Sequence, residues 1–133
     1  MSINDELEAI ETLFQVQLPI DYRAFLTTHH EDLLDPSLSC EMTAIAGVGD
    51  IATIDGLYTA KQILDNERRQ ASCDPEQRML IIGYELFGGY LYLNYSSERL
   101  GEIYFRAPYV SNQFGYLANT FSSFLAKCSP TDS

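Results

Sequence analysis

Residues 79–95 read MLIIGYELFGGYLYLNY and predict the central β-structure of the fold. The apolar run 79–82 is typical of a strand buried inside a sheet, and 90–95 alternates between two faces as strands do. Between them, residues 83–89 contain three glycines and predict a turn-rich link. A polar loop over 96–101 and a return strand over 102–106 complete an antiparallel hairpin.

Helical patterns lie on both sides of this hairpin. Before it, Thr59 and Gln62 have the spacing of a capping box, and apolar residues at 60, 63 and 64 predict a helix that ends near residue 69. After it, apolar residues at 117, 121, 124 and 125 predict a C-terminal helix, with Pro130 beyond its end.

The first thirty residues predict two more helices. Apolar residues at 3, 7, 10 and 14 form a single stripe, and Ser2 with Asp5 forms a second capping box. Pro19 suits the first turn of the next helix, because its φ is helical and its missing N–H needs no partner there. The inner face of this second helix carries Tyr22, Phe25, Leu26 and His29.

The segment between these helices and the hairpin predicts short strands and loops. Residues 42–46 predict a strand, the glycines at 47 and 49 a turn, and 51–54 a neighbouring strand or an irregular segment. Polar loops are expected at 31–41 and 70–78, each of which contains an Asp-Pro pair.

This order of elements predicts an α+β fold rather than repeated βαβ units. We expect one domain over residues 1–133. Its mainly antiparallel sheet is flanked by two N-terminal helices, a middle helix and a C-terminal helix. A flexible tail is expected over about 128–133.

Composition excludes several classes of function. Nineteen acidic and eight basic residues leave a net charge of −11, which argues against nucleic-acid binding, because phosphate contacts need surplus Lys and Arg. No apolar stretch of about 18 residues predicts a membrane span, and the acidic start does not resemble a secretory signal. Cys40, Cys73 and Cys128 form no CxxC pair, and free thiols favour a reducing cytoplasm. We therefore expect a cytoplasmic protein with no cofactor, nucleic-acid partner or membrane partner.

The negative charge is concentrated in the first part of the chain. Residues 1–55 contain eleven acidic residues and one basic residue, Arg23, whereas the remainder contains eight acidic and seven basic residues. Such a segment can serve solubility alone, or it can steer a basic partner into contact and raise the association rate about 10 to 10³-fold. Composition does not choose between the two.

Two local patterns suggest binding chemistry but lack its requirements. His29-His30-Glu31-Asp32 looks metal-binding, yet adjacent histidines on a helix point about 100° apart, and the chain has no third histidine. We expect His29 to be a hydrogen-bonded, partly buried residue. Residues 47–52 match GxGxxA, but the helix that must follow is interrupted by Gly56. We expect no metal site and no dinucleotide site here.

No catalytic constellation is indicated. The chain has no GxSxG nucleophile elbow, and no cysteine lies among basic residues that would lower its pKa. The pair Gly88-Gly89 predicts a positive φ or a close backbone approach at the start of the aromatic strand. A turn or bulge entering the strand is the favoured explanation of these glycines. Tyr84, Tyr90 and Tyr92 are candidates for exposed residues that contact a partner.

The order of these segments resembles the SUKH superfamily, which contains SMI/KNR-type cell-wall synthesis regulators and many bacterial toxin-immunity proteins. LPIDYRAFL at 18–26 looks like the family signature that follows the opening helix. IIGYELFGGYLYLNY at 81–95, followed by a return strand, looks like its aromatic hairpin. LANTFSSFL at 117–125 looks like its terminal helix. The chain departs from the family pattern at His29-His30-Glu31-Asp32, where an Asn-Gly-Gly turn is common, and it has no tryptophan.

The resemblance implies a domain that binds another protein and performs no catalysis. In bacteria, such members neutralise a cognate toxin, often a nuclease, by stoichiometric binding. A basic toxin domain would be attracted by the acidic surface, and apolar or aromatic residues would hold the complex. The expected contact residues are Glu31, Asp32, Asp35, Asp50, Asp55, Tyr84, Glu85 and Tyr90. The alternatives are a cytosolic regulatory scaffold of the cell-wall-regulator type, and a small-molecule-binding domain or enzyme that uses residues 47–55 with His29-His30.

Overall fold

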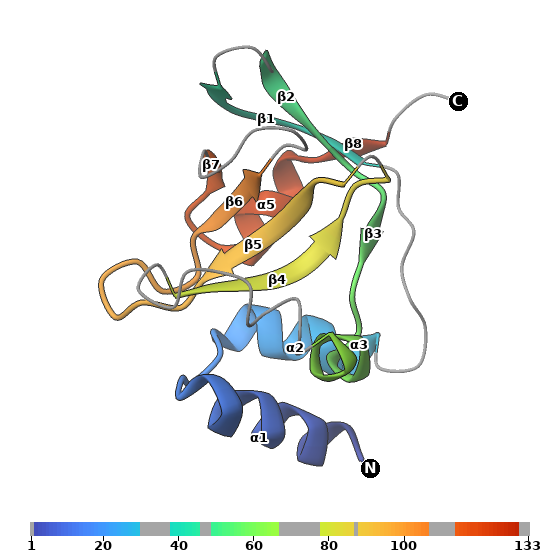
Figure 1. Cartoon of the computed structure of the whole chain (residues 1–133), viewed down its shortest axis with the longest axis vertical. Helices are drawn as coiled ribbons and strands as arrows, with labels where there is room; N and C mark the ends of the chain where they lie inside the picture. Colours follow the sequence, from blue (N-terminus) through green and yellow to red (C-terminus); the bar gives the residue numbers. More distant parts are fainter. Residues whose placement is uncertain are drawn as a thin grey trace.

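The structure is a computed structural model that describes residues 2–29, 38–45, 49–66, 78–86, 88–106 and 114–130. Within these residues the chain has an α+β fold with antiparallel sheets, as the sequence predicts (Figure 1). The described helices are α1 (Ile3–Phe14), α2 (Ile20–Thr28), α3 (Ala60–Asp65) and α5 (Phe121–Lys127). The strands are β1 (Leu38–Ile45), β2 (Gly49–Ile54), β3 (Gly56–Leu57), β4 (Met79–Tyr84), β5 (Tyr90–Asn94), β6 (Ile103–Arg106), β7 (Phe114–Ala118) and β8 (Ser129–Pro130).

The predicted hairpin forms the middle of a five-stranded antiparallel sheet in the order β3-β4-β5-β6-β7. Leu93 of β5 lies opposite Leu80 of β4 on one side and Ile103 of β6 on the other. Both faces of β5 are buried, because Leu91, Tyr92 and Leu93 are each at most 1% exposed. The side chains of β5 therefore alternate between two buried faces of the sheet, rather than between a buried face and a solvent-exposed face.

A second sheet of three strands, in the order β2-β1-β8, adjoins the first where β1 contacts β7. Strand β1 begins at Leu38, four residues earlier than the apolar run predicts, because half-buried Leu38 and buried Cys40 extend its inner face. Ser129 and Pro130 were expected in the flexible tail. They instead form β8 and pair with β1.

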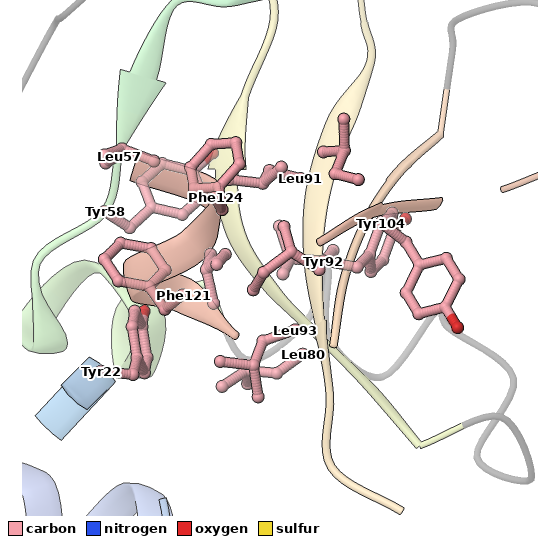
Figure 2. Close-up of a cluster of buried hydrophobic side chains, with 14 of the residues drawn as sticks. Tyr22, Leu57, Tyr58, Leu80, Leu91, Tyr92, Leu93, Tyr104, Phe121 and Phe124 are labelled. Atoms are coloured by element: carbon pink, nitrogen blue, oxygen red, sulfur yellow. The ribbon is translucent and has the colours of Figure 1, made fainter. Parts of the chain in front are cut away.

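The helices bury their apolar stripes against one another and against the sheets. Helix α1 packs on α2 and α3, α2 packs on α5, and α5 packs on β7 and β1. Figure 2 shows the rings of Tyr22, Phe121 and Phe124 together at one side of the core cluster, with Tyr104 at the other side. The ring centroids of Tyr22 and Phe121 are 4.8 Å apart in an edge-to-face arrangement, which aromatic pairs favour.

The signature LPIDYRAFL connects three helices. The Asp21 carboxylate accepts a hydrogen bond from the Ser122 amide in the first turn of α5, at 2.9 Å. Arg23 forms an ion pair with Glu11 of α1 at 3.5 Å, and the same glutamate accepts the Leu18 amide at 2.8 Å. These polar contacts surround buried Tyr22, so the signature residues hold the helices in place.

Arg78 connects the end of α1 to the large sheet. Its guanidinium donates hydrogen bonds to the carbonyls of Phe14 and Gln15, and it lies 4.6 Å from the centre of the Tyr95 ring. Arg78 has a φ of 49°, a backbone conformation that costs free energy in a residue with a side chain. These contacts offset that cost.

Several element boundaries differ from the sequence expectation. Leu117 belongs to β7, and helix α5 begins only at Phe121, after Thr120 accepts a hydrogen bond from the Ser123 amide as its N-cap. The apolar residues from 117 to 125, which predict a single helix, therefore belong to two elements: the end of β7 and helix α5. The capping boxes of α1 and α3 are both present, but Pro19 is the N-cap of α2 rather than a residue inside its first turn. The described part of α3 ends at Asp65.

We predict that Tyr22→Phe protects the fold at alkaline pH. The buried Tyr22 hydroxyl has no hydrogen-bond partner among the described residues, and burial raises the pKa of Tyr22 far above its usual value of about 10. The phenol ionises above about pH 10 only in the unfolded chain. Its contribution to stability is therefore complete below that pH and falls by about 1.4 kcal/mol per pH unit above it.

The measurement is urea denaturation of both proteins at pH 7, 10 and 11. Tyr22→Phe should be as stable as the wild type at pH 7, or up to about 1 kcal/mol more stable, and should lose less stability from pH 10 to 11. Equal losses in the two proteins would contradict the prediction.

We predict that Gly83→Ala destabilises the five-stranded sheet. A Cβ atom at Gly83 would lie 2.6 Å from the Gly56 carbonyl oxygen and 3.3 Å from Leu91 Cβ, so β3 must move. The expected loss is about 1–3 kcal/mol of unfolding free energy in urea denaturation. As a control, Ser97→Thr adds one methyl group at an exposed loop residue and should change stability by less than about 0.5 kcal/mol. Equal stability of Gly83→Ala and the control would refute the tight β3–β4 contact.

Candidate protein-binding surface

One face of the five-stranded sheet carries a row of aromatic side chains. Tyr92, Tyr104 and Tyr116 are register partners on β5, β6 and β7. Phe114 contacts two of them, with ring centroids 5.1 Å from Tyr92 and 6.4 Å from Tyr104. Tyr90 continues the row on β5, 6.5 Å from Tyr92. The row runs from a buried centre to half-exposed rings at Tyr90 and Tyr116.

Tyr104 is the polar member at the buried centre of this row. Its hydroxyl donates a hydrogen bond to the Glu102 carboxylate at 2.7 Å, and Arg99 donates to the same hydroxyl at 3.3 Å. Burial, followed by the hydrogen bond to Glu102, raises the pKa of Tyr104. Tyr104 is therefore a fixed, neutral hydrogen-bonding group near physiological pH.

The turn that joins β4 to β5 is held in place by a small hydrogen-bond network. Asp55, which follows β2, donates its amide to the Tyr84 carbonyl at 2.9 Å, and its carboxylate accepts the Leu86 amide at 2.8 Å. The Glu85 amide donates to the Gly89 carbonyl at 2.8 Å. The Asp55 bonds tie the start of the turn to the segment between β2 and β3, and the Glu85–Gly89 bond closes the turn.

The two glycines of this turn have the two roles that the sequence suggests. Gly88 has a φ of 106°, which residues with side chains rarely adopt. A Cβ atom at Gly89 would lie 2.9 Å from the Phe105 ring and 3.0 Å from a Glu85 carboxylate oxygen. The backbone of the turn is thus restricted to one path.

The turn borders a shallow depression of about 340 Å³ on the molecular surface. It is lined by Tyr58, Tyr84, Glu85, Leu86, Gly88 and Tyr90. Tyr58 and Tyr84 stack with ring centroids 5.6 Å apart, and Tyr84 lies opposite Tyr90 in the register of β4 and β5. Leu86 stands at the rim with 73% of its side chain exposed, so an apolar group projects beside half-buried aromatic rings. We call Asp55 together with the residues lining this depression the Tyr84–Tyr90 surface.

Four of the eight expected contact residues meet at the Tyr84–Tyr90 surface. Asp55, Tyr84, Glu85 and Tyr90 all lie there. Asp50 does not, because it stands at the other end of β2, where the strand rise places it about 16 Å from Asp55. Glu31, Asp32 and Asp35 lie outside the described residues.

Two residues differ from the sequence expectation: Tyr92 is buried rather than exposed, and Leu86 is an exposed residue that the sequence patterns did not single out. Tyr92 was a candidate for the surface, but it is only 1% exposed, because Phe114 and its neighbours on the sheet cover it. Leu86 is apolar in the middle of a turn rich in glycine. An apolar residue inside a glycine-rich turn is the signal that could have identified it.

The acidic residues of the first 55 positions do not gather into one patch within the described segments. One group lies on α1, where Asp5 and Glu8 are exposed, and another lies on β1 and β2, where Glu41 and Asp50 are exposed. Figure 1 places α1 and the β1–β2 hairpin at opposite ends of the molecule. The exposed carboxylates of these two groups therefore lie at two ends of the molecule. Asp55 and Glu85 belong to neither group.

The other patterns weighed in the sequence have ordinary structural positions. The ring of His29 packs 4.8 Å from that of Phe25 at the end of α2, and His30 lies outside the described residues. Residues 49–52 of the GxGxxA match lie in strand β2 (Gly49–Ile54) rather than at the start of a helix. In the described part of the chain, no three His, Cys, Asp or Glu side chains cluster as metal ligands, and no helix is long and apolar enough to cross a membrane.

A comparison with known protein families finds a match over most of the chain. The sequence model described as the SMI1 / KNR4 family (SUKH-1) matches residues 4–127 and so spans nearly the whole chain, from α1 to the end of α5. No curated protein matches the chain.

We predict that the Asp55 carboxylate is what holds the turn at Leu86. Asp55→Ala removes the acceptor of the Leu86 amide, whereas Asp55→Asn keeps a carbonyl oxygen in its place. Amide hydrogen exchange by NMR should be about 5-fold faster at Leu86 in Asp55→Ala, the effect of losing about 1 kcal/mol. It should be close to wild type in Asp55→Asn. Equal exchange rates in all three proteins would show that the turn is held by other contacts.

Proposed function

The chain belongs to the SMI1 / KNR4 family (SUKH-1), and we propose that it is a non-catalytic domain that binds another protein. Its role in this proposal is that of an immunity protein, which neutralises a cognate bacterial toxin by forming a stoichiometric complex. The partner is a basic toxin domain, for example a nuclease, met in the cytoplasm.

The observation that carries this proposal is the Tyr84–Tyr90 surface. Protein-binding hot spots combine large apolar or aromatic anchors with few polar groups, and rigid anchors lose little entropy on binding. Leu86 supplies an apolar group that is 73% exposed, on a turn held by the Asp55 carboxylate. Tyr84 and Tyr90 supply half-buried rings beside it. The depression of about 340 Å³ can receive a side chain of the partner.

Charge supports a basic partner. The net charge of −11 attracts a positively charged domain over a distance of about one Debye length, and this attraction speeds encounter more than it strengthens the final complex. The carboxylates of Asp55 and Glu85 both belong to the Tyr84–Tyr90 surface, although Glu85 is only 9% exposed. In this arrangement the overall charge brings the toxin close and the apolar anchors hold it.

The mechanism needs no bond to be made or broken by the chain. The domain covers or distorts the active site of the toxin, so the substrate of the toxin no longer reaches it. Inhibition is then one-to-one and ends when the complex dissociates.

The experiment that tests this function starts from any toxin-like gene found next to the gene for this chain. Co-expression of the two should restore growth, and the purified proteins should form a one-to-one complex. We predict that Leu86→Ala weakens that complex about 10-fold by calorimetry, since an exposed anchor that becomes buried is worth about 1–2 kcal/mol. The matched control is Ile20→Ala on α2, which truncates an apolar side chain that is 88% exposed and should leave the affinity unchanged.

Other outcomes would favour the two alternatives. If no toxin binds, and pull-down from the native host instead recovers housekeeping proteins of the cell-wall pathway, the chain is a regulatory scaffold. If a single metabolite raises the melting temperature by several degrees, the chain is a small-molecule-binding domain. Equal affinities of Leu86→Ala and Ile20→Ala for a bound toxin would place the interface away from the Tyr84–Tyr90 surface.

A further inference from the structure

Two cysteines that are 88 positions apart in the sequence are brought together where β8 pairs with β1. Strands β1 and β8 are antiparallel, with Leu38 opposite Pro130 and Ser39 opposite Ser129. The next pair in this register is Cys40 and Cys128. The backbone of Cys128 is extended, with φ −70° and ψ 147°. The antiparallel alignment of the two segments therefore continues to this pair.

The pair occupies the kind of position in which side chains of neighbouring strands come closest. Hydrogen-bonded and non-hydrogen-bonded pairs alternate along an antiparallel ladder. Pro130 has no amide hydrogen, so its pair with Leu38 is of the non-hydrogen-bonded kind. By alternation, Cys40 and Cys128 are also a non-hydrogen-bonded pair. The Cys128 amide agrees with this assignment, because it donates to the Phe124 carbonyl at 3.1 Å instead of to β1.

This position matches the geometry of a disulfide. Cα atoms of a non-hydrogen-bonded pair are about 4.5 Å apart, which lies within the range of about 4.4–6.8 Å found across disulfides. In the structure both residues are free thiols, and they are hydrogen-bonded to each other. The two sulfur atoms therefore lie within hydrogen-bonding reach of each other.

The environment of the two thiols differs. Cys40 is buried in the core with 2% of its side chain exposed, whereas Cys128 is half-buried. The hydrogen bond between them lowers the pKa of Cys40 and raises the pKa of Cys128. The first thiolate of the pair thus forms on Cys40, and a thiolate is the form that attacks an oxidised sulfur.

We propose that Cys40 and Cys128 form a reversible disulfide that fastens the C-terminal end of the chain to β1 when the protein meets a peroxide. One thiol reduces hydrogen peroxide to water and becomes a sulfenic acid. The other sulfur attacks this sulfenic acid, forms the S–S bond and releases a second water molecule. The pair gives up two electrons and two protons in all. A dithiol such as dithiothreitol returns it to the reduced state by exchange.

The bond would act on the part of the fold that closes the core. Cys128 directly follows α5, whose Phe121 and Phe124 are almost wholly buried, and β1 crosses the middle of the three-stranded sheet. The disulfide would close a loop of about 90 residues, for which the loss of unfolded-state entropy is large. The oxidised domain would therefore stay folded under conditions that unfold the reduced one.

The test uses the full chain carrying Cys73→Ser, so that only the two facing cysteines remain. Treatment with hydrogen peroxide should lower the mass by two hydrogen atoms, and proteolysis should yield one peptide pair linked through Cys40 and Cys128. The melting temperature should rise by roughly 10 °C and return to its starting value with dithiothreitol. The matched control, Cys73→Ser with Cys128→Ser, changes the half-buried member and should show neither the linked peptides nor the rise.

Three results would overturn the inference. The first is a pair that stays reduced or goes on to sulfinic acid under peroxide. The second is a disulfide between two molecules, seen as a dimer on a non-reducing gel. The third is a linked peptide pair without a rise in melting temperature, which would show that the bond does not stabilise the closed fold.

Discussion

The contact between α2 and α5 is the interaction on which the rest of the structure depends. The ring centroid of Phe121 lies 4.8 Å from that of Tyr22 and 4.7 Å from that of Phe25. Helix α5 therefore packs on α2 through aromatic rings. Asp21 fixes the direction of α5 through the Ser122 amide. The hydrogen bond at Ser122 and the packing of the Phe121 ring together fix the position and direction of α5. They therefore also fix where its C-terminal end lies. The position of β8 beside β1, and hence of Cys128 beside Cys40, follows from this contact.

The proposed binding surface lies at the turn between β4 and β5, two neighbouring strands of the five-stranded sheet. Figure 2 shows Tyr22 of α2 with Phe121 and Phe124 of α5 at one side of the core, whereas the turn joins the ends of β4 and β5. A network of backbone and Asp55 hydrogen bonds restricts this turn, and Leu86 within it is largely exposed. Rigid support beneath an exposed apolar group is what a binding surface needs, because little conformational entropy is then lost in the complex.

The proposed disulfide and the proposed binding surface lie in different sheets. Cys40 and Cys128 belong to the β1–β8 side, and Tyr84 to Tyr90 belong to the β4–β5 side. Oxidation would therefore stabilise the domain without touching the side chains that hold a partner. A protein of this kind could keep its partner bound while its C-terminal end is covalently fastened.

Residues close in sequence determined much of this protein by themselves. The capping boxes at Ser2 and Thr59, the alternation of 90–95 and the positive φ at Gly88 are local effects, and they were predictable because the interacting groups are at most a few residues apart. The signature at 18–26 also indicated the family, which the family match confirms.

Contacts between distant segments decided the remainder. Leu117 has a spacing that suits a helix, yet β6 pairs with its segment and makes it a strand. Alternation placed Tyr92 on one face of a strand, but only the packing of Phe114 against it showed that this face is buried. Asp50 and Asp55 are only five positions apart in sequence, yet an extended strand separates them in the structure. Cys40 and Cys128 are 88 positions apart in sequence, yet they lie close together in the structure. Local pattern encodes which way a residue faces along its own element, and tertiary packing alone decides what lies opposite it.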